Sequence, residues 1–119
     1  MTGQDIITEA RVTLMDEDAT DYRFADTLLL GYLNDGQQAL YSKRRDCVLL
    51  DTDEVITSDP PVDLAALDET IAMETKWRAP LVWYVLWRTY DTENDEHQQG
   101  AKGMALGFKA RFDEGAKAL

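Results

Sequence analysis

The chain has 119 residues, 45% of them hydrophobic and 29% charged, which suits one small globular domain and not a disordered segment. Its 23 acidic and 12 basic residues give a formal net charge of −11, whereas a protein that grips DNA through its phosphates needs a basic footprint. No apolar run approaches the roughly 20 residues that cross a bilayer, and the first residues lack the basic and apolar regions of a secretory signal.

Residues 4–15 are predicted to form a first helix, because four apolar residues recur on one helical face: Ile6, Ile7, Ala10 and Leu14. Glu9, Arg11 and Thr13 fall on the opposite face, which we expect to face solvent. The acidic segment 15–21 follows the C-terminal end of this helix, where the helix dipole disfavours negative charge. We therefore expect it to be an exposed, mobile loop.

A second helix is predicted over residues 26–44, where one apolar stripe continues through Leu29, Tyr32, Leu33, Gly36 and Leu40. The run Asn34-Asp35-Gly36 is typical of a turn, but the apolar period stays in phase across it. A glycine inside a helix costs about 1 kcal/mol relative to alanine, and it lets another helix approach closely.

The middle of the chain, about residues 46–76, is predicted to be an irregular insertion. Val48-Leu49-Leu50 and Val55-Ile56-Thr57 are short apolar or β-branched runs, which indicate two short strands or a small hairpin. Pro60 and Pro61 then interrupt regular structure. The helical spacing of Leu64, Leu67 and Ile71 suggests a short helix near residues 63–73.

A third helix is predicted over residues 80–91, with Pro80 in its first turn. It is apolar nearly all round, so we expect it to be the central, most buried element; a buried strand is the alternative. A last helix is predicted over residues 95–117. It carries an apolar stripe and a second stripe of small residues: Gly100, Gly103, Gly107 and Ala110. Either packing tolerates these glycines, or they let another backbone approach, such as that of a neighbouring subunit.

The sequence carries no recognisable catalytic constellation. The single Cys47 lies beside an apolar run and is interpreted as a small buried residue. His97 is the only histidine, and its acidic neighbours are typical of helix capping more than of metal ligation. Trp77, Trp83 and Trp87 are interpreted as core residues. The alternative is a base-stacking platform of Trp83 and Trp87 with Tyr84 and Tyr90. We therefore expect no enzyme activity, metal or cofactor.

Two stretches carry a resemblance to a known family. The first runs Phe24-Ala25-Asp26-Thr27-Leu28-Leu29-Leu30-Gly31-Tyr32-Leu33-Asn34-Asp35-Gly36, and the second runs Arg78-Ala79-Pro80-Leu81-Val82-Trp83-Tyr84-Val85-Leu86-Trp87-Arg88-Thr89-Tyr90. In their order and spacing they resemble the second and third helices of head-to-tail connector (adaptor) proteins of tailed double-stranded DNA phages. The final segment, with Phe108 and Phe112, is similar to the closing helix of that family. The likeness covers both ends of the chain and leaves residues 46–76 unmatched.

The chain departs from the family pattern at the start of the second helix. Ala25 stands where the family has a capping Ser or Thr, and Leu28 stands where Glu would complete a capping box. Loss of such a cap typically costs about 1 kcal/mol.

The resemblance implies one domain over residues 1–119, mostly α, with about four main helices and a short extended or β-hairpin insertion. It implies a structural virion protein at the neck, between capsid and tail, made in the host cytoplasm. Its partners would be further copies of itself in a ring, commonly of twelve, the portal protein and a downstream tail or neck protein. DNA would pass through the ring without specific binding, and no membrane would be involved.

Candidate site residues follow from these expectations. The subunit interface is predicted at the small-residue stripe and at Arg44 and Arg45, within a basic spot suited to an acidic neighbour. Portal or tail docking is predicted at four apolar residues of the insertion: Val48, Leu50, Val55 and Ile56.

The net charge has three interpretations: solubility alone, repulsion of DNA from a surface that DNA slides past, or mimicry of DNA. The alternatives to a connector are accordingly a tail-completion or neck protein lower in the same particle, and a small acidic inhibitor that mimics DNA.

Overall fold

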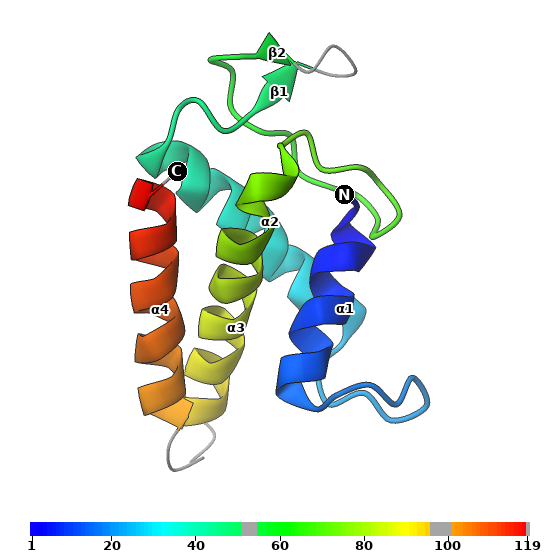
Figure 1. Cartoon of the computed structure of the whole chain (residues 1–119). Helices are drawn as coiled ribbons and strands as arrows, with labels where there is room; N and C mark the ends of the chain where they lie inside the picture. Colours follow the sequence, from blue (N-terminus) through cyan, green and yellow to red (C-terminus); the bar gives the residue numbers. More distant parts are fainter. Residues whose placement is uncertain (51–54, 96–100, 119) are drawn as a thin grey trace.

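The computed structural model describes residues 1–50, 55–95 and 101–118. Its elements, in chain order, are α1 (Gly3–Leu14), α2 (Asp26–Lys43), β1 (Leu49–Leu50), β2 (Val55–Ile56), the 3₁₀ turn η1 (Thr75–Trp77), α3 (Arg78–Asp95) and α4 (Ala101–Ala118). The helix α3 lies between α4 on one side and α1 on the other, and α2 crosses behind it (Figure 1). A small hairpin of β1 and β2 projects from one end of the helical body (Figure 1).

The predicted fold class is confirmed: the domain is mostly helical, with a two-stranded antiparallel hairpin between α2 and α3. The described parts of the four helices lie within a few residues of the predicted ranges, and Pro80 falls in the first turn of α3 as expected. The last helix is predicted to start at residue 95, but Asp95 is the final residue of α3; residues 96–100, the next part of its predicted range, lie outside the described part. None of the described helices is long and apolar enough to span a membrane.

The core is organised around α3, as its nearly all-apolar sequence predicts. Leu81, Val85 and Leu86 are almost completely buried, and Trp77 in η1 is fully buried beneath them in the same cluster. Tyr84 stacks edge-on against Trp87 and against Phe112 of α4, with ring centroids 5.1 and 5.2 Å apart. These contacts make α3 the element against which the other three helices pack.

One charged side chain of α1 lies in the core, contrary to the expectation for its face. Arg11 is 3% exposed, and its guanidinium bonds to Asp16, which is 4% exposed, at 2.7 Å. It also donates to the Phe24 carbonyl at 2.9 Å and to Asp26 at 2.7 Å. The prediction of Arg11 on the solvent face was wrong, because bonding partners outside α1 take up its charge and most of its donors.

The acidic loop after α1 is only partly as expected. Residues 17–21 are exposed, but Asp16 is buried and accepts backbone N–H groups from Arg23 at 2.8 Å and Phe24 at 3.2 Å. Asp16 therefore ties the loop to the start of α2. Phe24, just before that helix, is buried in the core cluster that also holds Leu29, and Ala25 supplies no side-chain cap, as its sequence predicts.

The short helix expected near residues 63–73 is absent from that range, all of which is described. The backbone groups that would form it bond elsewhere. The Asn34 amide accepts from Leu64 N–H at 2.8 Å and donates to Leu64 carbonyl at 3.0 Å. The carbonyls of Leu67 and Glu69 accept the first N–H groups of α1, at 2.7 and 3.1 Å. The segment satisfies the open amino end of α1 instead of forming a helix of its own.

The glycines of the helices fall into two groups. A Cβ on Gly36 would lie 2.9 Å from Tyr84 Cδ1, so this glycine allows α2 and α3 to approach closely, as predicted. Gly115 plays the same part in α4, since a Cβ there would lie 2.8 Å from Trp83 Cζ3. In contrast, a Cβ on Gly107 would meet nothing within 4 Å.

We expect Gly36→Ala to destabilise the domain by about 1–3 kcal/mol through overpacking against Tyr84. Gly107→Ala should stabilise it by up to about 1 kcal/mol, because alanine is the better helix former and the site is open. Chemical denaturation of both variants measures the difference. Equal stabilisation by the two substitutions would show that the close α2–α3 contact is absent.

Candidate docking surfaces

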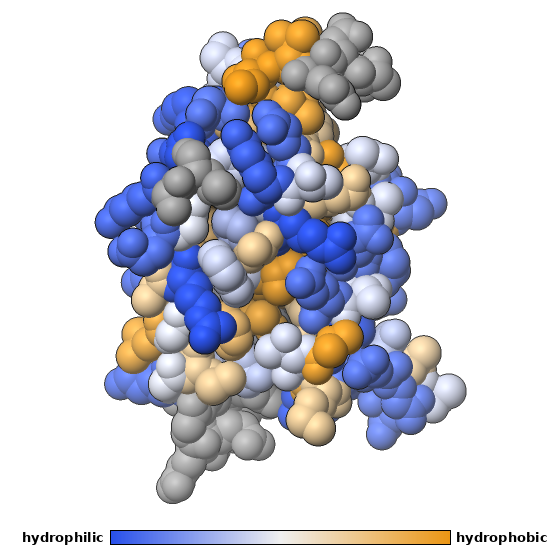
Figure 2. Space-filling view, viewed as in Figure 1, coloured by the Kyte–Doolittle hydropathy of each residue, from blue (hydrophilic) through white to orange (hydrophobic). Residues whose placement is uncertain are grey.

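The hairpin carries three exposed apolar side chains among the described residues. Leu50, Val55 and Ile56 are 50%, 55% and 50% exposed, and Figure 2 shows apolar surface at the projecting end of the molecule. Val48, the fourth residue predicted to dock, is only 3% exposed and belongs to the core. Val48 therefore anchors the hairpin in the core and does not offer a docking surface.

The outer edge of β2 is open among the described residues. Leu49 pairs with Ile56 and Leu50 with Val55, and Thr57 N–H donates to the Val48 carbonyl at 2.9 Å. In an antiparallel ladder every second residue turns its backbone groups away, so those of Ile56 point to the free edge. On the other side, Leu49 N–H bonds to Ala72 at 2.7 Å, which closes that edge. An exposed apolar strand edge of this kind is a docking feature in many proteins.

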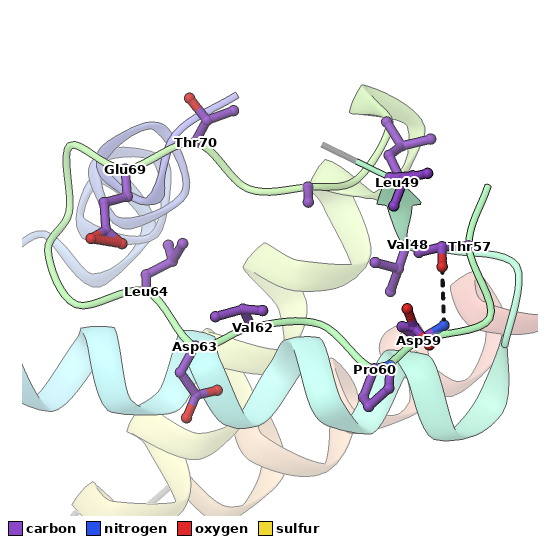
Figure 3. Close-up of a pocket in the computed structure, with 12 residues that line it drawn as sticks. Val48, Leu49, Thr57, Asp59, Pro60, Val62, Asp63, Leu64, Glu69 and Thr70 are labelled. Carbon is purple, nitrogen blue, oxygen red and sulfur yellow. Dashed lines mark hydrogen bonds between the residues drawn. The ribbon is translucent and has the colours of Figure 1, made fainter. Parts of the chain in front are cut away.

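A cavity of about 360 Å³ lies between the hairpin and the segment that returns from it to α3 (Figure 3). Apolar side chains such as Val48, Val62 and Leu64 line it, and its acidic lining residues are Asp59, Asp63 and Glu69. None of the described residues that line it is basic. The Asp59 N–H donates to Thr57 Oγ1 at 3.2 Å and holds the turn beside it (Figure 3). This surface is suited to a partner that carries apolar and basic groups, not to a DNA phosphate.

The outer face of α4 is the second candidate surface. Gly103 and Gly107 have open space around them, and Ala110 is exposed beside them. Gly100, the fourth small residue predicted here, lies outside the described part. Met104 and Leu106 flank this strip and are 45% and 56% exposed. Among the described residues, none comes within 4 Å of a Cβ built on Gly103 or Gly107, and Ala110 is exposed, so this strip is open.

The predicted basic spot is largely neutralised within the chain. Arg44 bonds to Asp46 through both carboxylate oxygens, at 3.0 and 2.9 Å, and donates to the Ala116 carbonyl at 3.2 Å. The hydrogen bond from Arg44 holds the pKa of Asp46 below its ordinary value. Arg45 is exposed, with its guanidinium 4.5 Å from the centre of the Tyr41 ring. Arg44 therefore closes the end of α4 onto α2, and of the two arginines predicted at the interface Arg45 is the exposed one.

Cys47 is 1% exposed, as predicted for a small buried residue, and burial raises the pKa of its thiol to about 11. At pH 8 the thiolate fraction alone should slow alkylation by iodoacetamide about 100-fold relative to the unfolded chain. Mass spectrometry of the time course, with and without denaturant, measures this ratio. Equal rates in the two conditions would contradict the burial of Cys47.

The tryptophans, and the possible metal ligands within the described ranges, can be placed in the fold. Trp77 is fully buried, and Trp83 and Trp87 are half-buried against α4, which agrees with core residues and not with an open stacking platform. His97 lies outside the described residues. Within the described ranges, no three Cys, Asp, Glu or His side chains come together as metal ligands would.

The two stretches that carry the family resemblance meet in the fold. Arg88 of the second stretch lies 4.9 Å from the centre of the Tyr32 ring and 3.4 Å from Asp35, both in the first stretch. Gly36 packs on Tyr84, and the Tyr32 hydroxyl shares a 2.6 Å hydrogen bond with Thr92. These residues form the contact between α2 and α3. No protein-family model, curated protein or solved structure matches the chain.

Proposed function

We propose that the chain is a head–tail connector, a structural subunit that assembles as a ring beneath the portal of a phage capsid and joins it to the tail. The observation that carries the proposal is the meeting of the two connector-like stretches in one helix–helix contact. Residues separated by about fifty positions in the sequence, Tyr32 and Asp35 on one side and Arg88 on the other, are paired side by side. If each stretch resembled the family only by chance, there would be no reason for the two stretches to pair in this way.

The surfaces support an assembly role. The hairpin projects from the body and exposes Leu50, Val55 and Ile56, so it serves as the arm that docks on the portal or on the next tail protein. The excess of acidic residues suits a wall past which DNA moves, because phosphates find few cations there to replace their counterions. Binding, not catalysis, is the function of these surfaces.

The test is binding to a purified portal assembly, followed by mass photometry. A connector adds mass in multiples of 13.5 kDa up to a fixed stoichiometry, with the protein alone as control. Binding to a tail-tube or neck complex, and not to the portal, would favour a tail-completion protein. A stoichiometric complex with a nuclease or polymerase, without binding to either assembly, would favour the DNA-mimic alternative.

A further inference from the structure

The outward face of α1 is acidic with an apolar centre. Gly3, Ile6, Ile7, Ala10 and Leu14 are buried, so on a helical wheel Asp5, Thr8, Glu9 and Val12 point away from the core. Val12 is 54% exposed, and Met15 at the end of the helix is 88% exposed. We call these five residues the α1 face: Asp5, Thr8, Glu9, Val12 and Met15.

Negative charge dominates around the α1 face. Arg11 is the only basic side chain in residues 1–22, and it is buried. Glu17, Asp18 and Asp21 are exposed in the loop that follows. The nearest described cation on the face is Arg78, which bonds Glu9 at 2.8 Å.

The outward face of α4 has the opposite character. Ala105, Phe108, Phe112 and Ala116 are buried against the body, so Gly103, Gly107 and Ala110 point outward between Met104 and Leu106. These five outward residues are called the α4 face. The helix carries four basic and two acidic residues in a chain whose net charge is −11. Lys102, Arg111 and Lys117 are exposed on it.

The two faces lie on opposite sides of the molecule. The helix α3 separates α1 from α4, and no contact joins α1 to α4 in the described ranges (Figure 1). A ring requires this arrangement, since each subunit must present complementary surfaces on two different sides.

We infer that the α1 face of one copy docks on the α4 face of the next copy, with Val12 and Met15 packed along the open backbone at Gly103 and Gly107. This assignment rests on the proposed ring and names the surfaces that close it. Open glycines let a second helix approach closely, and the acidic flank of α1 then faces the basic flank of α4. Pairing of two α1 faces would bring like charges together, which disfavours a symmetric dimer through this surface.

The test is disulfide trapping between two variants, Val12→Cys and Gly107→Cys, one of them carrying a size tag. Both positions are open, so neither substitution disturbs the core, and Cys47 is buried. Oxidation of the mixture at about millimolar concentration should give the tagged–untagged dimer, whereas each variant alone should give none. The double variant should give a ladder of covalent oligomers. The yield should fall several-fold between about 0.05 M and 0.5 M salt, because salt screens the facing charges.

The matched control replaces Val12→Cys with Thr75→Cys, a position on η1 that is also exposed. A yield no higher than this control, or homodimers from either variant alone, overturns the inference. The outcomes also separate this contact from the proposed function. A ladder from a protein that never binds portal leaves the α1–α4 contact standing, and portal binding by rings that are not trapped by this pair refutes only the contact.

Discussion

Replacement of Arg11 by leucine is expected to destabilise the domain by about 3–5 kcal/mol, since removing one partner of a buried ion pair leaves the other charge without compensation. Arg11 and Asp16 are 3% and 4% exposed, and the guanidinium joins the end of α1, the following loop and the first turn of α2. The loss therefore affects three segments at once. Urea denaturation followed by circular dichroism measures it.

Arg78→Leu is the matched control, because Arg78 makes an ion pair of similar length with Glu9 at the surface, at 2.8 Å. Exposed pairs contribute at most about 1 kcal/mol. The double variant Arg11→Leu with Asp16→Asn should cost less than the sum of its parts, because no unpaired carboxylate is then left in the core. Similar losses for Arg11→Leu and Arg78→Leu would contradict the buried network.

Replacement of an exposed apolar residue of the hairpin by a charged one is expected to abolish docking while leaving the fold intact. Val55→Asp and Ile56→Asp place a carboxylate where an apolar side chain would be covered by the portal or tail partner, and an unpaired buried charge is costly. Each should weaken binding by about 30-fold or more, which corresponds to about 2 kcal/mol and is the level of an interface hot spot. Binding to the portal assembly is read by mass photometry.

The control for these two variants is Leu28→Asp, at the opposite end of α2 from the hairpin. Leu28 is 38% exposed, and an acid in the first turn of a helix is favourable, so the fold is not weakened. Its binding should stay within about twofold of the unchanged protein. Unchanged binding by both hairpin variants would remove the hairpin from the docking surface. A fall in the melting temperature of these variants would show that Val55 and Ile56 stabilise the fold instead.

The sequence predicts the helices well where one face is apolar and uninterrupted. Leu29, Leu33 and Leu40 specify the buried side of α2, and the period carries through Asn34-Asp35-Gly36 because Gly36 is the point at which Tyr84 packs. The same periodicity fails near residues 63–73. There Leu64 and Ile71 are buried as expected, but α1 and Asn34 take the backbone hydrogen bonds, and a single-segment pattern cannot reveal such distant partners.

The charged residues mark the other limit of sequence prediction. Arg11 looks like an ordinary surface residue, because the partners that make its burial tolerable, Asp16 and the Phe24 carbonyl, lie outside its helix. Val48 looks like part of an exposed apolar run, but it is 3% exposed and belongs to the core cluster, which its sequence neighbours do not reveal. For the docking surfaces, sequence indicates which residues are apolar or small, and the fold decides which of them are left uncovered.

The most direct test of the connector proposal is cryo-electron microscopy of portal-containing particles mixed with the purified protein. We predict a ring of this chain between portal and tail, with the hairpin of each copy against a neighbouring protein and α1 of each copy beside α4 of the next. Particles whose neck contains no density for the chain, even when the protein is added in large excess, would contradict the proposal.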